Sequence, residues 1–207
     1  MFHTHLLYTL DLFGTIVFAS SGALIAREQK RSWVVALFYA LLTAVGGGTM
    51  RDILLEKSSI FWLRNPGYIG LAATVGLLTF LLAGMTPLRR EQFWLADIVS
   101  LAIFTVIGAQ VAVESSIFGP TTSSYWLMPP LMGLLTSVGG GIVRDLSGAR
   151  IPYVVQDPCY SLSSLAGGSV YMMLIGVQVA SSLAIGGTIV TILGLHILRS
   201  HRQIVTI

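Results

Sequence analysis

The sequence predicts an all-α membrane protein of seven transmembrane helices, in which two inverted three-helix repeats are followed by a seventh helix. Composition is the first observation behind this prediction: 54% of the 207 residues are hydrophobic and 10% are charged, whereas soluble domains carry roughly 25% charged residues. The second observation is a Gly-Gly-Gly-x-x-Arg-Asp motif at 46–52 that recurs at 139–145. So little charge cannot cover a water-soluble domain of this length, and we therefore expect one compact bundle in a lipid bilayer.

The predicted helices correspond to apolar stretches that approach the length of about 20 residues needed to span a membrane. No basic segment precedes the first stretch, so we expect it to be retained rather than cleaved as a signal peptide. The last two stretches are joined by almost no loop, around Gly176 to Gln178. The seven stretches lie at 6–26, 33–50, 67–86, 93–113, 126–142, 158–176 and 178–198.

The distribution of Lys and Arg predicts the orientation, because cytoplasmic loops carry an excess of these residues. An odd number of spans places the two termini on opposite sides of the membrane. One side has only Lys57 and Arg64, if Arg51 and Arg144 are counted on neither side. We therefore expect the N-terminus outside and the C-terminus in the cytoplasm, with the chain in the inner (plasma) membrane. The cytoplasmic side collects Arg27, Lys30, Arg31, Arg89, Arg90, Arg150, Arg199 and Arg202.

An internal repeat covers most of the chain. Chance similarity between hydrophobic helices would not reproduce a charged motif twice in register. The matching segments are 11–23 with 97–109, 41–52 with 134–145, and Asn65-Pro66-x-Tyr68 with Asp157-Pro158-x-Tyr160.

Three helices in each repeat is an odd number, so the second copy must enter the membrane from the opposite face. Inverted repeats of this kind are typical of transporters and channels. Within a single membrane domain, 1–207, we assign 1–88 to the first repeat, 91–176 to the second, and 177–207 to the seventh helix and a cytoplasmic tail.

The glycine triplets within the second and fifth helices have two interpretations. Small residues can let two helices pack closely, or the triplets can break or bend the helices and expose carbonyl groups to a polar path. Close packing is usually met by glycines spaced four apart, whereas a contiguous triplet presents glycine on about three sides of a helix. We therefore favour breaks at Gly46, Gly47 and Gly48 and at Gly139, Gly140 and Gly141.

A charged pair follows each triplet: Arg51 and Asp52, then Arg144 and Asp145. A charge at the bilayer centre costs roughly 2.5–3.5 kcal/mol, so such groups usually face the bundle interior. Alternatively the helices end there and the pairs lie at the headgroups. Adjacent helical residues point about 100° apart, so we expect each charge to find its partner elsewhere. The repeat symmetry suggests Asp97 or Asp145 for Arg51, and Asp11 or Asp52 for Arg144.

Each repeat opens with an aspartate, Asp11 in the first and Asp97 in the second. A short polar residue at a helix start is ordinarily an N-cap, and the alternative is that these residues pair with an arginine or line an entrance. No histidine in the spans is placed to activate a serine, so we do not expect an enzyme. We also expect no cofactor, no metal site and no nucleic-acid partner.

The seven spans, the doubled motif and the Asp…Gly-Ala segments at 11–23 and 97–109 resemble the prokaryotic branch of the trimeric intracellular cation (TRIC) channel family. That branch is also seen as a small duplicated bacterial membrane domain for which glycine transport has been proposed. The resemblance implies a homotrimer embedded in membrane lipids, with a pore in each protomer lined by the broken helices. It implies conduction of monovalent cations such as potassium and sodium. The basic lipid-binding motif of animal members is not matched at 49–52.

Two functions therefore remain open. In a cation channel, freed carbonyl groups and the carboxylates of Asp52 and Asp145 would coordinate the ion, while Arg51 and Arg144 would act in gating. In a secondary transporter of a small zwitterion such as glycine, a helix N-terminus would bind the carboxylate, and an aspartate would bind the amine.

Overall fold

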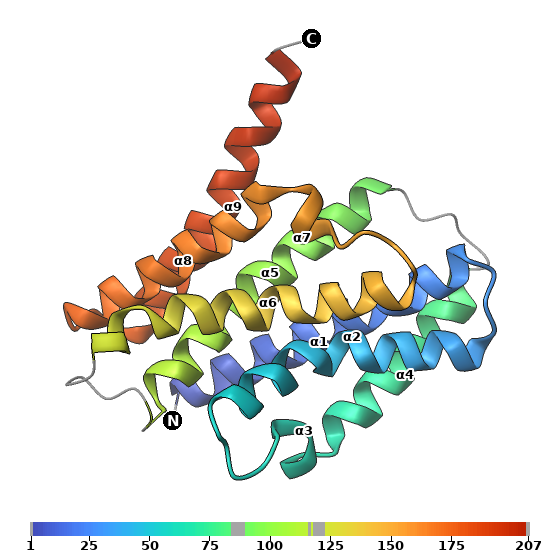
Figure 1. Ribbon diagram of the computed structural model, residues 1–207, viewed down its shortest axis with the longest axis horizontal. Coiled ribbons are helices and arrows are strands. Elements are labelled where there is room, and N and C mark those ends of the chain that lie inside the picture. The colour runs from blue at the N-terminus through green and yellow to red at the C-terminus, as the bar shows by residue number, and fades with distance from the viewer. Residues whose placement is uncertain (1, 84–89, 116, 118–122, 206–207) are drawn as a thin grey trace.

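The computed structural model describes residues 2–83, 90–115, 117 and 123–205, and the side chains of 6–83, 97–115, 117 and 124–199. All regular structure in these ranges is helical (Figure 1). Two helices of four residues, α3 (Phe61–Arg64) and α7 (Tyr153–Gln156), and a 3-10 turn, η1 (Ser123–Trp126), lie between the long helices. The long helices are α1 (Phe2–Glu28), α2 (Trp33–Leu54), α4 (Gly67–Leu82), α5 (Arg90–Val113), α6 (Met128–Ser147), α8 (Pro158–Gly176) and α9 (Ser181–Val205).

Each predicted apolar stretch falls largely within one of these long helices. By length and composition, four segments of the described chain could cross a membrane: Leu6–Glu28, Trp33–Leu54, Ser124–Ser147 and Ser181–Arg199. Two shorter helical segments, Gly67–Leu82 and Asp97–Val113, are also apolar. The chain is thus an all-helical membrane protein, and the number of spans stays a prediction.

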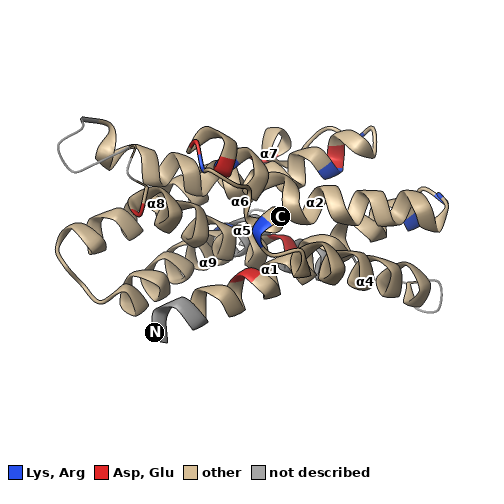
Figure 2. Cartoon of the chain, turned by 90° about the horizontal axis from the view of Figure 1, so that it is seen from below, with Lys and Arg blue, Asp and Glu red and all other residues tan. Residues whose placement is uncertain are grey.

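The surface of the bundle is strongly apolar. Large hydrophobic side chains such as Phe38, Met173 and Val190 are 57%, 65% and 70% exposed. Figure 2 shows how few of the helical residues are charged. An exposed apolar surface of this extent suits contact with lipid rather than water.

Four long helices end in the same way, with a non-glycine residue in the left-handed region. These residues are Lys30 after α1, Glu56 after α2, Ala149 after α6 and Gln178 after α8, with φ of 54°, 45°, 51° and 60°. In each case the next backbone N–H donates back to a carbonyl of the last helical turn, as Lys57 N does to Asp52 O at 3.0 Å. Such caps satisfy carbonyl groups that a helix end leaves without partners.

The predicted breaks at the glycine triplets are absent. Both α2 and α6 continue without interruption through their triplets and end several residues later. The triplets instead pack against each other: a Cβ on Gly47 would lie 2.1 Å from Thr136 O, and one on Gly140 would lie 2.4 Å from Thr43 O. Close helix packing, the alternative interpretation, therefore describes this structure, because only glycine lets the two backbones approach so closely.

Residues at matching positions of the two repeats also contact each other. The ring of Phe18 stacks on that of its counterpart Phe104, with centroids 4.7 Å apart. Gly47 and its counterpart Gly140 meet at the crossing of α2 and α6. Contacts between a residue and its own counterpart are what a two-fold relation produces. In Figure 1, α2 and α6 lie side by side and run in opposite directions, so that their C-terminal ends point toward opposite ends of the bundle.

One end of the bundle holds much of the predicted cytoplasmic charge. An ion pair of 2.7 Å between Arg150 and Glu28 brings the turn after α6 next to the turn after α1, where Lys30 and Arg31 also lie. Arg89 lies outside the described residues, and the side chains of Arg90 and Arg202 lie outside them as well. The orientation in the membrane stays a prediction.

Candidate functional site

The first charge cluster lies at the C-terminal end of α2. Arg51 and Asp52 are 6% and 1% exposed, and the guanidinium reaches the carboxylate with Nε 2.9 Å and Nη2 2.8 Å from Oδ1. The other carboxylate oxygen of Asp52 accepts a hydrogen bond of 2.8 Å from the backbone N–H of Phe61, at the start of α3. Asp52 therefore joins the arginine to the short helix that follows.

An aromatic group and a second carboxylate complete the first cluster. The ring centroid of Phe61 lies 5.7 Å from Arg51 Cζ. Tyr68, in α4, donates a hydrogen bond of 2.6 Å from its hydroxyl to Asp11 Oδ2, and its ring packs edge-on against Phe61. Asp11 interacts electrostatically with Arg51, but the ion pair of Arg51 in the described chain is with Asp52 alone.

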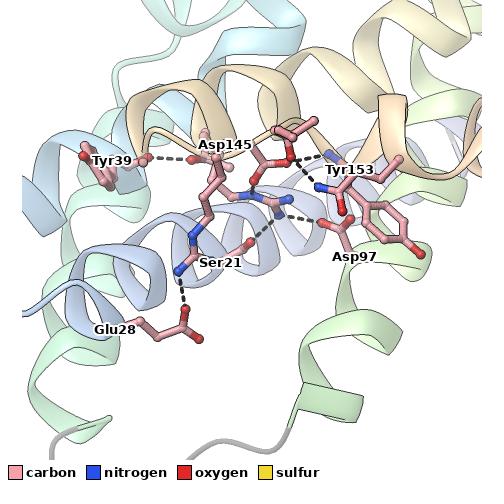
Figure 3. A network of polar contacts seen from close by, with 12 residues as sticks. Ser21, Glu28, Tyr39, Asp97, Asp145 and Tyr153 are labelled. Atoms are coloured by element: carbon pink, nitrogen blue, oxygen red, sulfur yellow. Dashed lines mark hydrogen bonds and ion pairs between the residues drawn. The ribbon is translucent and has the colours of Figure 1, made fainter.

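The second cluster lies at the C-terminal end of α6 and is bound more fully (Figure 3). Arg144 and Asp145 are each 5% exposed, and Arg144 Nε donates to Asp145 Oδ1 at 2.8 Å. The Nη1 atom of Arg144 donates to Asp97 Oδ1 at 2.7 Å and to Ser21 Oγ at 2.6 Å. Asp145 Oδ2 accepts from the backbone N–H of Tyr153, at the start of α7, at 2.9 Å.

The two clusters share one plan. In each, the motif aspartate binds its neighbouring arginine and the first backbone N–H of a four-residue helix. In each, a tyrosine of the repeated Pro-x-Tyr segment interacts with the aspartate near the start of the repeat: Tyr68 donates a hydrogen bond to Asp11, and Tyr160 interacts electrostatically with Asp97. Because α2 and α6 run in opposite directions, the clusters lie toward opposite ends of the α2–α6 pair (Figure 1).

The pairing differs from the sequence prediction in two respects. The predicted partners from the opposite repeat are not used among the described residues, and the arginine and aspartate of each motif do bind each other. The helical angle between adjacent residues fixes only the Cβ directions, and the long arginine side chain can turn back to its neighbour. Asp11 and Asp97 lie inside α1 and α5 rather than at their N-caps, and Asp97 forms an ion pair with Arg144.

The buried charged groups of both clusters have ion-pair and hydrogen-bond partners. A buried ion pair is costly unless good geometry and further hydrogen bonds satisfy both groups. Within the described part of the chain, every buried side-chain nitrogen and oxygen has a hydrogen-bond partner. Sequence reasoning missed Ser21, Phe61 and Tyr153 as members of the site. The repeated Pro-x-Tyr segments were the available signal for Tyr68 and Tyr160.

The described residues hold no group of three or more His, Cys, Asp or Glu placed to bind a metal ion. The buried charged groups of the two motifs instead form two guanidinium–carboxylate clusters. A guanidinium beside a carboxylate offers both a cationic and an anionic partner to a small ion or zwitterion.

A family model described as "Glycine transporter" matches this chain twice, at residues 8–84 and 94–176. Inner membrane protein YadS of Escherichia coli K12 is 35% identical over 196 residues, covering 91% of this chain and 89% of that protein. A UPF0126 membrane protein of Vibrio cholerae is 34% identical over 185 residues, covering 88% and 74%.

Solved structures share the fold. A TRIC channel orthologue from Rhodobacter sphaeroides superimposes with a TM-score of 0.85 at 29% identity, covering 92% of this chain and 95% of that one. A TRIC channel from a study of conductance gives a TM-score of 0.82 at 25% identity, covering 94% and 93%.

Fold and comparisons together define a multi-pass, all-helical membrane protein with the architecture of the TRIC channels. The chain belongs to the bacterial family described as glycine transporters, within the prokaryotic branch of the TRIC family. The resemblance predicted from the doubled motif is thereby confirmed. The relatives reported above are described as membrane proteins, and the solved structures are TRIC channels, which are not enzymes.

Proposed function

We propose that the chain is a monovalent cation channel, conducting potassium and sodium through a path inside each protomer of a homotrimer. The observation that carries the proposal is the pair of buried charge clusters at opposite ends of the α2–α6 crossing. The structural similarity to TRIC channels supports the same conclusion.

The proposed path passes between the two clusters along α2 and α6. The carboxylates of Asp52 and Asp145 provide the negative charge that attracts a cation, and Arg51 and Arg144 oppose its passage while they occupy these carboxylates. Opening therefore requires each arginine to leave its aspartate. The glycine triplets bring the backbones of α2 and α6 into direct contact between the two clusters.

The proposed topology follows the sequence prediction. Seven helices cross the membrane as inverted repeats at 1–88 and 91–176 and a seventh segment at 177–207, with the N-terminus outside and the C-terminus cytoplasmic. Antiparallel α2 and α6 and the contacts between counterpart residues support the inversion. The double match of one family model supports the duplication.

Recording from the purified protein in planar bilayers tests the proposal. The wild type is expected to show unitary cation currents. Asp52→Asn and Asp145→Asn each remove a carboxylate charge and are expected to lower the cation-to-anion permeability ratio. Glu28→Gln is the matched control, since it removes a carboxylate from an ion pair whose two side chains are 41% and 55% exposed. If both aspartate variants keep the wild-type conductance and selectivity, the carboxylates do not line the path.

A second candidate is a secondary transporter of a small zwitterion such as glycine. The description of the matching family model favours it, and a guanidinium beside a carboxylate has the two charges that a zwitterion requires. Flux into proteoliposomes separates the candidates. Saturable glycine uptake without unitary conductance would replace the channel by the transporter.

A further inference from the structure

We propose that Arg199, on α9, is a positioning residue that holds α7 against the second charge cluster, so that opening of this cluster depends on the seventh helix. This inference rests on the proposed function, in which the Arg144 cluster is one of two gates. It assigns a role to the helix that lies outside the repeats.

The junction between α7 and α8 connects α9 to the cluster. Asp157, which is 8% exposed, accepts hydrogen bonds from the Tyr153 hydroxyl at 3.1 Å and from the Cys159 backbone N–H at 3.0 Å. The same carboxylate forms an ion pair with Arg199. Since the backbone N–H of Tyr153 binds Asp145, a continuous chain of contacts runs from Arg199 through Asp157 and Tyr153 to the cluster.

A second contact from α9 reaches the opposite flank of the cluster. His196, 3% exposed, lies with Nε2 3.0 Å from Ser163 Oγ, and its ring packs against Tyr160 at a centroid distance of 6.1 Å. Tyr160 in turn interacts electrostatically with Asp97, the carboxylate that pairs with Arg144. The two contacts of α9 are thus linked to the two aspartates that pair with Arg144. Arg199 is linked to Asp145, and His196 is linked to Asp97.

Among the described residues, the first cluster has no ion pair from a further long helix; α3 is instead held to α2 by a hydrogen bond of 2.9 Å from Trp62 Nε1 to Thr49 Oγ1. The counterpart of Tyr153 is Phe61, which has no hydroxyl, and the counterpart of Asp157 is Asn65, which carries no charge. Asn65 is exposed; its side-chain oxygen accepts from the nearby Gly67 N–H at 3.1 Å, and its side-chain nitrogen donates to the Tyr8 hydroxyl at 3.4 Å. The duplication therefore produces two similar charge clusters, and only the Arg144 cluster is linked to α9 by contacts among the described residues. We infer that the Arg51 end opens first and that the Arg144 end opens when α9 releases α7.

Hydrogen–deuterium exchange of the full-length protein in nanodiscs tests the positioning role directly. Arg199→Gln removes the charge that holds Asp157, and exchange of the amides of residues 153–157 is expected to rise on the order of tenfold, because the local opening energy falls with the lost ion pair. Arg199→Lys, which keeps the positive charge opposite Asp157, is expected to retain slow exchange. Arg31→Gln is the matched control, an exposed arginine at the same end for which the described chain contains no ion pair.

Bilayer recording then tests the dependence of the gate. Arg199→Gln is expected to raise the open probability several-fold while the unitary conductance stays unchanged, since Arg199 holds the gate shut from outside the path. Unchanged exchange at 153–157, or an equal effect of Arg31→Gln, overturns the positioning role whatever the currents show. Faster exchange with an unchanged open probability overturns the dependence of the gate on α9. Faster exchange in a protein that passes no current leaves the positioning role in place and removes the channel proposal.

Discussion

At the scale of single residues, the crossing of α2 and α6 leaves no room for larger side chains at Gly47 and Gly140. A Cβ on Gly139 would lie 2.9 Å from Gly47 Cα, and Cβ atoms on Gly47 and Gly140 would meet backbone oxygens of the opposite helix. Backbone atoms cannot move aside as a flexible side chain can. The crossing therefore explains the glycines at 47, 139 and 140, while a Cβ on Gly48 would meet the Phe61 ring of α3 at 2.6 Å.

Alanine substitution at Gly47 tests this constraint. Gly47→Ala is expected to destabilise the folded protein by about 1–3 kcal/mol, the usual cost of overpacking, because the added methyl meets Thr136 O. The control is Gly70→Ala in α4, where nothing lies within 4 Å of the added Cβ. Thermal denaturation in detergent measures both. A Gly47→Ala melting temperature equal to that of Gly70→Ala would contradict the close crossing.

The sequence predicted that the motif charges need partners, but it did not predict which ones. The amino-acid sequence shows that Arg144 is followed by Asp145 and that Asp97 lies at the start of the second repeat. It does not show that one guanidinium can turn back to its neighbour and also reach Asp97 and Ser21. Side-chain reach and helix crossing decide this, and neither is encoded in residue spacing.

At the scale of elements, α3 and α7 link each motif to the next long helix. Both have four residues, too few for a periodic pattern to reveal in the sequence. Each presents its first backbone N–H to a buried aspartate, Phe61 N to Asp52 and Tyr153 N to Asp145. The long helices were predictable from apolar length alone, whereas each of these short helices begins at a backbone N–H that a buried carboxylate accepts from.

Proline at the start of α3 tests that dependence. Phe61→Pro removes the N–H that Asp52 accepts, at a helix position where proline is otherwise well tolerated. Phe61→Ala removes the ring but keeps the N–H, so the difference between the two variants isolates the hydrogen bond. We expect Phe61→Pro to be less stable than Phe61→Ala by about 1.5–3 kcal/mol, as for a hydrogen bond to a charged group. Equal melting temperatures of the two variants would show that α3 does not depend on Asp52.

At the scale of the whole molecule, the duplication predicts that the two charge clusters are equivalent. The structure shows that they differ in their contacts with the rest of the bundle. Composition and the doubled motif were enough to predict an all-helical membrane bundle. The contacts that link α9 to the Arg144 cluster were not predictable, because they depend on where α9 packs. Two ion pairs, with Asp97 and Asp145, and one hydrogen bond, to Ser21, hold Arg144, whereas Arg51 has Asp52 as its ion-pair partner.

The native cysteine allows the orientation of the whole molecule to be tested. Cys159 is exposed in the first turn of α8, beside the α7 turn that the excess of Lys and Arg places in the cytoplasm. A membrane-impermeant maleimide is therefore expected to label the protein in inside-out vesicles and to leave it unlabelled in intact spheroplasts. The matched variant carries Lys57→Cys in a Cys159→Ser background, and residue 57 follows α2 at the opposite end of the α2–α6 pair. Its labelling is expected to be reversed, because antiparallel α2 and α6 carry their C-terminal turns to opposite faces.

Labelling of both cysteines from one side would contradict the inversion. If Cys159 is labelled in spheroplasts and the cysteine at position 57 is not, the topology is the reverse of the expected one, and the Arg144 cluster lies toward the outside of the cell.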